Sequence, residues 1–282
     1  MGKYQKLIVA VVVVGILIGA VTHMLKLQST VMALKAENEQ LVDENAVLSI
    51  DLELARQEAQ LGTKPPATPQ QPKFAYLTFD DGPSANTEKI LDILKQHDVK
   101  ATFFVIGSET EYSKHTYQRI VEEGHAIGLH GYDHVYANIY QSEDAFMDSM
   151  YKLRDLVEAN TGVKPDIMRF PGGSNTTFST KYGGQGLAAK LAARIHDEGM
   201  QYFDWNVSSQ DATRPLVDTQ VIIDSTLRGA QGRNQAIVLL HDAPAKKTTV
   251  EALPAIIEGL KSQGYTFEVL KRDTPPAHFR LP

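Results

Sequence analysis

The stretch FAYLTFDDGPS, residues 74–84, decides the fold of this chain. Its first six residues, Phe74–Phe79, are apolar, aromatic or β-branched, a composition typical of a buried β-strand. Two carboxylates, Asp80 and Asp81, follow this strand directly, and a Gly-Pro-Ser turn comes next. The stretch therefore predicts a strand that crosses the core and ends in two acidic side chains.

Six further runs of the same kind alternate with amphipathic helical patterns. The predicted strands are Thr102–Ile106, Ala126–Leu129, Ile167–Phe170, Tyr202–Val207, Ile237–Leu240 and Thr266–Leu270. The clearest helical patterns are Thr87–His97, Tyr117–Glu123, Glu143–Ala159 and Val250–Ser262. This alternation predicts an α/β fold with a parallel sheet, and about seven strands suit a barrel or near-barrel. A doubly wound open sheet is the alternative, but no G-x-G-x-x-G pattern of a dinucleotide fold follows the first strand.

Polar side chains gather at or near the carboxyl ends of these predicted strands. The set is Asp80, Asp81, His130, His134, Arg169, Asp204 and His241. Because the carboxyl ends of barrel strands open on one face, we expect these side chains to share one site there.

Composition narrows the chemistry of such a site. The net charge of −6 does not provide the broad basic surface that a nucleic acid requires. The chain contains no cysteine, which excludes disulfides and thiolate metal sites. Any metal must therefore be held by histidines and carboxylates.

His130 and His134 are the first candidates for metal ligands. A spacing of four places two imidazoles on one side of a helical turn, where they can chelate one cation. Asp81 can supply a third ligand from a neighbouring strand end, and two histidines with one carboxylate leave a coordination position open for water. The alternatives are a surface helix that carries two unrelated histidines, and a turn in which Ser84 caps the next helix.

The N-terminal residues 1–25 predict a membrane anchor. Lys3 and Lys6 precede an unbroken apolar run from Leu7 to Val21, which continues less strictly to Leu25. The 19 residues from Leu7 to Leu25 would reach ~28 Å as a helix, close to the thickness of a bilayer core. Lysines before the span favour a cytoplasmic N-terminus with the rest of the chain outside the cell. A cleaved signal peptide is the alternative.

Residues 26–61 predict a coiled-coil stalk. Leucines recur every seven residues, at Leu27, Leu34, Leu41 and Leu48, and asparagines occupy two of the other seam positions. This pattern favours a parallel homodimer through residues 24–61, with a solvated single helix as the alternative. The proline-rich residues 62–73 then form a semi-rigid linker to the large domain, residues 74–282.

Five segments in this order resemble the motifs of the NodB-type polysaccharide deacetylases, carbohydrate esterase family 4. They are TFDDGP (78–83), the pair His130 and His134, RFPGG (169–173), Asp204-Trp205 and LLHD (239–242). The resemblance covers Phe74 to about Leu270. It implies a distorted (β/α) barrel and one divalent metal, commonly Zn²⁺, with Co²⁺ or Ni²⁺ as alternatives.

The resemblance also implies how the chain binds a metal and activates water. Asp81, His130 and His134 would be the metal ligands. Asp80 would be the general base, and Arg169 would hold its carboxylate by a charge-assisted pair.

The remaining motif residues would act on the leaving group and the acetyl group. His241 would be the general acid, with Asp204 fixing its tautomer and raising its pKa. The N–H of Gly172 would bind the oxyanion, and Trp205 and Leu239 would enclose the acetyl methyl group.

Two positions depart from the family pattern. Gly131 stands where the family usually has Ser or Thr, so a hydrogen bond that steadies the metal loop is expected to be missing. Gly172 stands where the third motif usually carries an aromatic residue or a second proline, so a side-chain wall of the sugar site is expected to be missing.

Together these features predict a metal-dependent hydrolase that removes N-acetyl groups from a cell-wall polysaccharide, most simply the N-acetylglucosamine of peptidoglycan, and releases acetate. Chitooligosaccharides and acetylxylan are alternative substrates. A non-catalytic glycan-binding wall protein and a different metallohydrolase, such as a phosphoesterase, are alternative classes. The single three-ligand set argues against two-metal chemistry.

Overall fold

The structure, a computed structural model, describes residues 71–282 together with Gly2 and Val31. The predicted anchor (1–25), the stalk (26–61) and most of the linker (62–73) lie outside the described residues, and so does the predicted dimer interface. Among the residues that are described, no helix has both the length and the apolar character needed to cross a bilayer. Gln71–Pro282 form one compact unit.

A parallel sheet forms the centre of this unit. Seven strands lie in the order β5-β4-β3-β2-β1-β7-β6, and an eighth, β8, pairs with β1 beside this path. All paired strands are parallel. The strands are β1 (Lys73–Asp80), β2 (Thr102–Val105), β3 (Ala126–Leu129), β4 (Ile167–Met168), β5 (Gln201–Tyr202), β6 (Val207–Ser208), β7 (Gln235–His241) and β8 (Tyr265–Phe267).

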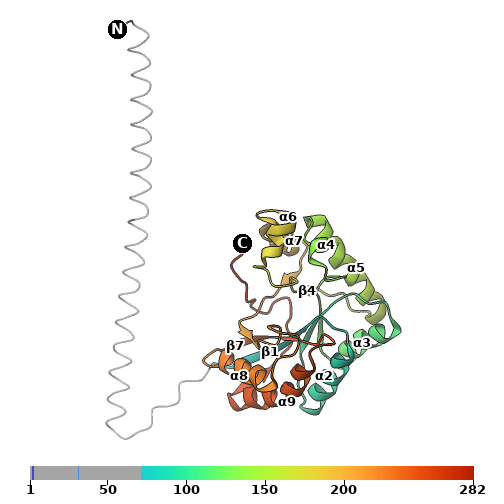
Figure 1. Cartoon of the computed structure of the whole chain (residues 1–282), viewed down its shortest axis with the longest axis vertical. Helices are drawn as coiled ribbons and strands as arrows, with labels where there is room; N and C mark the ends of the chain where they lie inside the picture. Colours follow the sequence, from blue (N-terminus) through green and yellow to red (C-terminus); the bar gives the residue numbers. More distant parts are fainter. Residues whose placement is uncertain (1, 3–30, 32–70) are drawn as a thin grey trace. The chain divides into compact units, whose positions relative to one another are not determined.

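Helices form an outer layer around these strands (Figure 1). They are α2 (Ala85–Gln96), α3 (Glu111–Glu122), α4 (Tyr136–Ile139), α5 (Glu143–Thr161), α6 (Thr177–Gly183), α7 (Leu187–Asp197), α8 (Thr219–Ala230) and α9 (Lys247–Ser262). Ser84 does cap α2, because its hydroxyl accepts a hydrogen bond from the N–H of Asn86. The prediction of an α/β fold with a curled parallel sheet, consistent with a (β/α) barrel, is confirmed.

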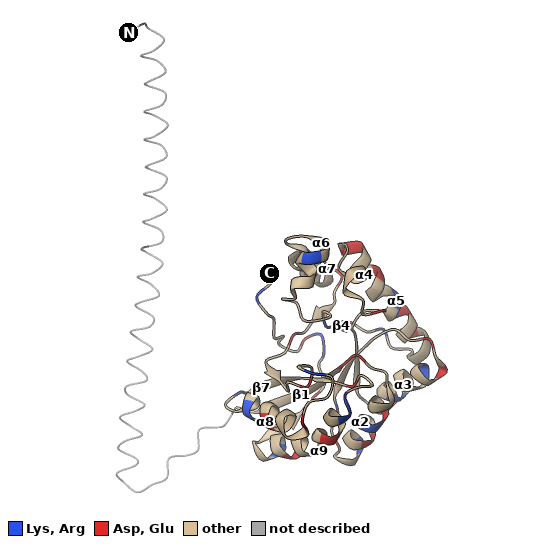
Figure 2. Ribbon diagram, viewed as in Figure 1, with Lys and Arg blue, Asp and Glu red and all other residues tan. Residues whose placement is uncertain are grey.

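Charged residues of both signs are interspersed along the outer helices (Figure 2). Arg119 of α3 illustrates their structural role, because its guanidinium pairs with Glu88 and Asp92 of α2 and with Glu123. The pairs with Glu88 and Asp92 join α3 to α2 at the surface of the domain.

Strand β1 is buried on both faces, which explains its nearly continuous apolar sequence. Ala75, Leu77 and Phe79 belong to the larger core, which also includes buried residues of the helices. Tyr76 belongs to a smaller inner core with residues such as Phe104. Because side chains alternate along a strand, Thr78 and Asp80 share the inner face with Tyr76. The strand thus delivers a carboxylate to the inside of the barrel.

The predicted strand Tyr202–Val207 is two short strands rather than one. β5 pairs with β4 and β6 pairs with β7, at opposite ends of the sheet path. The chain turns between them because Asn206 bonds to the backbone of β7. Its side chain accepts from the N–H of Ile237 and donates to the carbonyl of Gln235. Asp204 therefore lies in this turn and not within a strand.

Candidate active site

Arg169 and Asp80 form a buried pair on the inner face of the barrel. Arg169 is fully buried, and its Nη1 lies 2.9 Å from Asp80 Oδ1 and 2.6 Å from the Thr78 hydroxyl. Its other nitrogens donate to the carbonyl oxygens of Phe203 and Asp204. These four hydrogen bonds fix the position of the guanidinium, so the orientation of the Asp80 carboxylate is defined.

Asp80 has the properties of a general base. Burial raises the pKa of its carboxyl above the ordinary range, and the positive charge of Arg169 opposes that rise. Its second oxygen, Oδ2, faces the cluster of candidate metal ligands at 3.7 Å from His130 Nε2. A carboxylate with a raised pKa can accept a proton from water more readily than an ordinary one.

The three predicted metal ligands lie together. Asp81 Oδ1 is 3.6 Å from His130 Nε2 and 3.4 Å from His134 Nε2. One ligand atom from each residue can be chosen so that all three lie within 4.8 Å of one another. Asp81 adopts a left-handed backbone conformation, with φ of 78°, and its carboxylate approaches the same His130 Nε2 as Asp80 Oδ2 does. Non-glycine residues rarely adopt this conformation, and such strain is concentrated at functional sites.

The cluster fits a divalent cation. Asp81 Oδ1 is buried and has no hydrogen-bond partner within the described range, so an acceptor is available for a cation. His130 Nδ1 lies 2.9 Å from the carbonyl oxygen of Arg169, which makes Nδ1 the protonated nitrogen and leaves the lone pair on Nε2. Burial lowers the pKa of His130 to about 3, which keeps the imidazole neutral. Two histidines and one carboxylate are a set that suits zinc.

The two histidines are not brought together by a helical turn, so that prediction is wrong. They lie in the loop between β3 and α4, which reverses through positive φ values at Gly131 (87°) and His134 (50°). The loop is steadied from outside. Ser149 of α5 accepts a hydrogen bond from the N–H of Tyr132 at 2.8 Å. This bond holds the backbone next to Gly131, where the family usually has a hydroxyl side chain.

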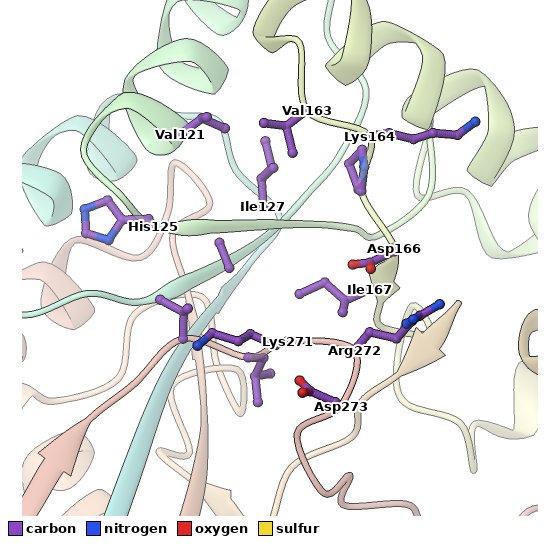
Figure 3. Close-up of a pocket in the computed structure, with 14 residues that line it drawn as sticks. Val121, His125, Ile127, Val163, Lys164, Asp166, Ile167, Lys271, Arg272 and Asp273 are labelled. Carbon is purple, nitrogen blue, oxygen red and sulfur yellow. The ribbon is translucent and has the colours of Figure 1, made fainter. Parts of the chain in front are cut away.

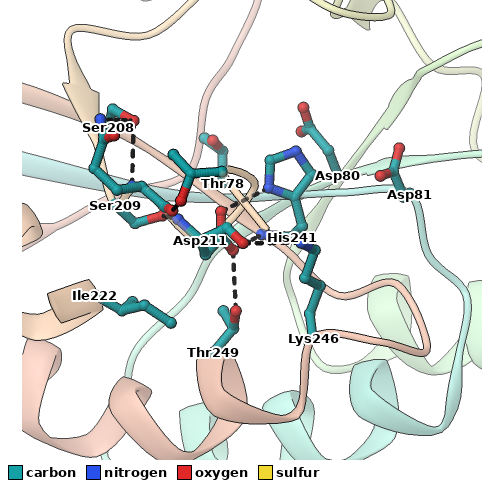
Figure 4. Close-up of polar contacts among 12 residues, drawn as sticks. Thr78, Asp80, Asp81, Ser208, Ser209, Asp211, Ile222, His241, Lys246 and Thr249 are labelled. Carbon is teal, nitrogen blue, oxygen red and sulfur yellow. Dashed lines mark hydrogen bonds and ion pairs between the residues drawn. The ribbon is translucent and has the colours of Figure 1, made fainter. Parts of the chain in front are cut away.

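His241 ends β7 on the other side of the site and is held by Asp211. Its Nδ1 lies 2.8 Å from Asp211 Oδ1, and its backbone N–H donates to Asp211 Oδ2 (Figure 4). Burial alone would lower the pKa of His241. The hydrogen bond and charge of Asp211, with the charges of Asp80 and Asp81, outweigh burial and raise the pKa to about 9. A protonated imidazole at neutral pH has the state required of a general acid.

The predicted pairing of His241 with Asp204 is therefore wrong. The Asp204 carboxylate accepts hydrogen bonds from the N–H and hydroxyl of Ser174 and from the N–H of Phe279. Because the chain turns at residues 203–206, Asp204 faces the Arg169–Ser174 loop and the C-terminal segment. Asp211 follows β6, the strand next to β7, and so reaches His241.

Sequence reasoning missed Asp211 because it lies in a polar stretch, SSQDATRP (208–215), that carries no strand or helix signal. The property that distinguishes Asp211 from its polar neighbours is its burial, and this burial arises from tertiary packing. The hydroxyl of Thr249 in α9 also donates to Asp211 Oδ2, and Lys246 donates to the Asp211 carbonyl. Asp211 is thus surrounded by donors from a segment more than thirty residues away in the chain.

A cavity of about 420 Å³ opens between the acid and the base. Eight of the ten predicted site residues line it, while Arg169 and Asp204 lie behind its wall. The lining residues are Asp80, Asp81, His130, His134, Tyr136, Gly172, Gly173, Trp205, Ala212, Leu239, His241 and Lys246. The N–H of Gly172 makes no backbone hydrogen bond within the described residues, whereas the next N–H, of Gly173, donates to Phe170. Gly172 therefore offers a free donor at the cavity wall.

A second cavity, of about 460 Å³, lies near the amino ends of β3 and β4, away from these residues (Figure 3). Its lining combines apolar side chains such as Ile127 and Ile167 with basic residues and with Asp166 and Asp273. His125 borders it, but His125 Nδ1 accepts a hydrogen bond from the N–H of Ala101, and burial lowers its pKa to about 4. His125 is thus a structural residue. Although this cavity is slightly larger, it lacks a paired acid and base, so the first cavity is the candidate active site.

The fold and this site define a class of protein. A carboxylate and a protonated histidine face one cavity at the carboxyl ends of parallel strands, next to three side chains able to hold one cation. This combination of a general base, a general acid and a metal site is typical of a hydrolase. The protein-family model described as "Polysaccharide deacetylase" matches residues 67–185 of this chain.

Comparison with known proteins narrows this class to a family. A putative polysaccharide deacetylase of Bacillus subtilis, YheN, is 36% identical over 209 residues, which are 73% of this chain and 70% of that protein. A peptidoglycan-N-acetylglucosamine deacetylase of Bacillus cereus is 34% identical over 206 residues, 72% of this chain and 71% of the relative. The crystal structure of the catalytic domain of a peptidoglycan N-acetylglucosamine deacetylase from Eubacterium rectale superposes with a TM-score of 0.71 at 36% identity, covering 78% of this chain and 99% of that domain. This chain belongs to the polysaccharide deacetylase family, carbohydrate esterase family 4.

Proposed function

We propose that this protein hydrolyses the N-acetyl groups of N-acetylglucosamine in peptidoglycan, in a metal-dependent reaction that releases acetate and leaves a free amine on the sugar. The observation that carries the proposal is that two paired side chains, one suited to act as a base and the other as an acid, lie at the same site. Asp80, which is paired with Arg169, and His241, which is paired with Asp211, line one cavity together with the candidate metal ligands. Amide hydrolysis requires both an activated water and a proton for a poor leaving group.

The chain's own residues supply the proton transfers. A divalent cation held by Asp81, His130 and His134 would polarise the acetamido carbonyl and make water more acidic at neutral pH. Asp80 accepts the proton of the attacking water. His241 then donates its Nε2 proton to the departing sugar nitrogen.

Two further features of the cavity suit an acetyl group. The free N–H of Gly172 donates to the acetamido oxygen as negative charge develops on it. Trp205 and Leu239 line the same cavity and offer apolar surface for the methyl group. Substitution of the N-acetyl group by a larger acyl group is therefore expected to slow the reaction.

The location of the enzyme is part of the proposal. The lysines that precede the apolar residues 7–25 favour an uncleaved anchor with the catalytic domain outside the cytoplasmic membrane. The heptad leucines of residues 26–61 favour a parallel homodimer. The anchor is tested by recovery of the full chain in the membrane fraction. The homodimer is tested by the mass of the full chain in detergent.

Acetate release by the full-length chain in detergent tests the proposed reaction. Purified peptidoglycan, N-acetylated chitooligosaccharides and acetylxylan are compared at equal acetyl content, and peptidoglycan is expected to give the highest kcat/KM. Asp80→Asn and His241→Ala are each expected to lose at least ~100-fold in kcat, because each removes one general acid–base group.

Metal content, measured in parallel, should be unchanged in both variants because neither residue is a proposed ligand. No acetate from any of the three substrates contradicts the proposed reaction. A preference for acetylxylan would leave the assignment as a hydrolase in place, but the substrate would then be an ester and not an amide.

A further inference from the structure

The Tyr136 hydroxyl lies next to the position that a side chain at residue 172 would take. Tyr136 begins α4, and it lines the candidate active site. A Cβ atom built on Gly172 would lie 3.2 Å from the Tyr136 hydroxyl oxygen. The expected loss of a wall at Gly172 is therefore made good by an aromatic residue from another loop.

The ring of Tyr136 is held firmly in this position. It stacks on Phe178 of α6, with ring centroids 4.3 Å apart and planes 15° apart. Its centroid also lies 5.2 Å from that of His134, a candidate metal ligand. The ring thus has partners along α6 and in the metal loop, and its position does not depend on its hydroxyl.

The hydroxyl itself is available to a ligand. The neighbouring Tyr140 donates its hydroxyl proton to the carbonyl oxygen of Pro171. In contrast, no hydrogen bond joins the Tyr136 hydroxyl to any residue in the described range 71–282. A tyrosine hydroxyl can donate one hydrogen bond. Tyr136 therefore brings an unpaired donor to the cavity wall, beside Gly172, whose N–H is the other free donor.

We propose that the Tyr136 hydroxyl donates a hydrogen bond to the acetamido oxygen of the substrate, alongside the N–H of Gly172. This inference rests on the proposed function and adds a catalytic residue to it. Two donors that converge on one oxygen stabilise developing negative charge without reorganisation. A glycine at position 172 suits this arrangement, because a Cβ there would lie 3.2 Å from both the Tyr136 and the Thr176 hydroxyl oxygens, and φ of 78° disfavours other residues.

Tyr136→Phe tests the inference, because it deletes the hydroxyl and keeps the stacked ring. Loss of a donor to an oxyanion lowers kcat by on the order of 10²-fold in other enzymes, and we expect a loss of at least ~10-fold here. KM, metal content and Tm should stay at the values of the unchanged chain. Tyr182→Phe is the matched control. Tyr182 lies in α6, outside the lining of the cavity, and its side chain is 38% exposed.

The full-length chain, Tyr136→Phe and Tyr182→Phe are assayed together on N-acetylated chitooligosaccharide and on peptidoglycan. Loss of kcat in Tyr136→Phe alone supports the assignment. Unchanged kinetics in Tyr136→Phe, or a rise in KM with unchanged kcat, overturns it while the proposed function stands. Absence of acetate release by the unchanged chain overturns the proposed function, and this inference with it.

Discussion

At the scale of single residues, the site depends on two buried ion pairs. Arg169 and Asp80 lie at 0% and 3% side-chain exposure, and His241 and Asp211 at 14% and 1%. Removing one partner of such a pair leaves the other charge buried and uncompensated, which is strongly destabilising. Conservative amide substitutions are therefore better probes of charge than alanine substitutions.

Asp211→Asn tests which carboxylate tunes His241. The folded-state pKa of about 9 lies above the ordinary value of about 6.5, so His241 is protonated at neutral pH and loses its proton as pH rises towards 9. Activity should follow this loss on the alkaline side. Asp211→Asn removes the charge that raises the pKa, so the alkaline limb of kcat/KM should move to lower pH. At pH 8 we expect a loss of at least ~10-fold.

Asp204→Asn is the control for this substitution. Its carboxylate bonds to Ser174 and Phe279, so the alkaline limb should stay in place. A shift of the limb in Asp204→Asn, with none in Asp211→Asn, would contradict the assignment. The pH dependence of stability follows the same sign, because the contribution of the His241–Asp211 pair is complete below about pH 6.5 and is lost as pH rises through about 9.

At the scale of elements, the C-terminal segment completes the wall of the site. The carbonyl oxygen of Ala277 accepts from the N–H of Asp204, and the N–H of Phe279 donates to the Asp204 carboxylate. The ring of Phe279 meets Trp205 edge-on, with centroids 4.8 Å apart. This segment therefore supports the turn between β5 and β6, which carries Trp205 into the cavity.

Removal of residues 277–282 should weaken both the turn and the catalytic cavity. Asp204 would lose one of its donors, and unmet hydrogen bonding of a buried group costs about 1–3 kcal/mol. We expect a lower Tm and a higher KM for the acetylated glycan, since Trp205 loses its support. Thermal unfolding and steady-state kinetics measure these effects. Arg280→Ala, at an exposed position of the same segment, should change neither, and an equal effect there would argue against the role of Asp204.

The strands differed in how well the sequence predicted their positions. β1, β2, β3 and β7 are buried and apolar, and their positions followed from composition within a few residues. β5 and β6 are two residues each, too short for a periodic signal, and were merged into one strand. The break between them decides which aspartate reaches His241. An error at the element scale thus became an error in the site.

At the scale of the whole domain, the three candidate ligands come from two separate strand ends. Asp81 follows β1, whereas His130 and His134 follow β3, about fifty residues later. A cation that binds all three therefore ties β1 to β3 only in the folded chain. Ligands that bind the folded state alone raise its stability by mass action.

Added Zn²⁺ should raise the free energy of unfolding by about 2.7 kcal/mol when its concentration is 100 times the Kd. A chelator should reverse the change. Denaturant unfolding of the full chain, with Co²⁺ and Ni²⁺ compared, measures this without reference to catalysis. His134→Ala should abolish the increase, and His97→Ala, which alters a surface pair with Glu258, should retain it. A full increase in His134→Ala would remove His134 from the ligand set.

The sequence by itself determined the α/β alternation, the polar residues at the strand ends and eight of the residues that line the cavity. These depend on local properties, namely the burial of short apolar runs and the chemistry of motif residues. Only the tertiary structure decided that Asp211 and not Asp204 holds His241, that a loop and not a helix joins the two histidines, and that Tyr136 covers Gly172. The first and the third are contacts between segments distant in the chain, and the loop that carries the histidines is held by Ser149 of the more distant helix α5. Such contacts depend on how the strands and loops close in space, which no local pattern encodes.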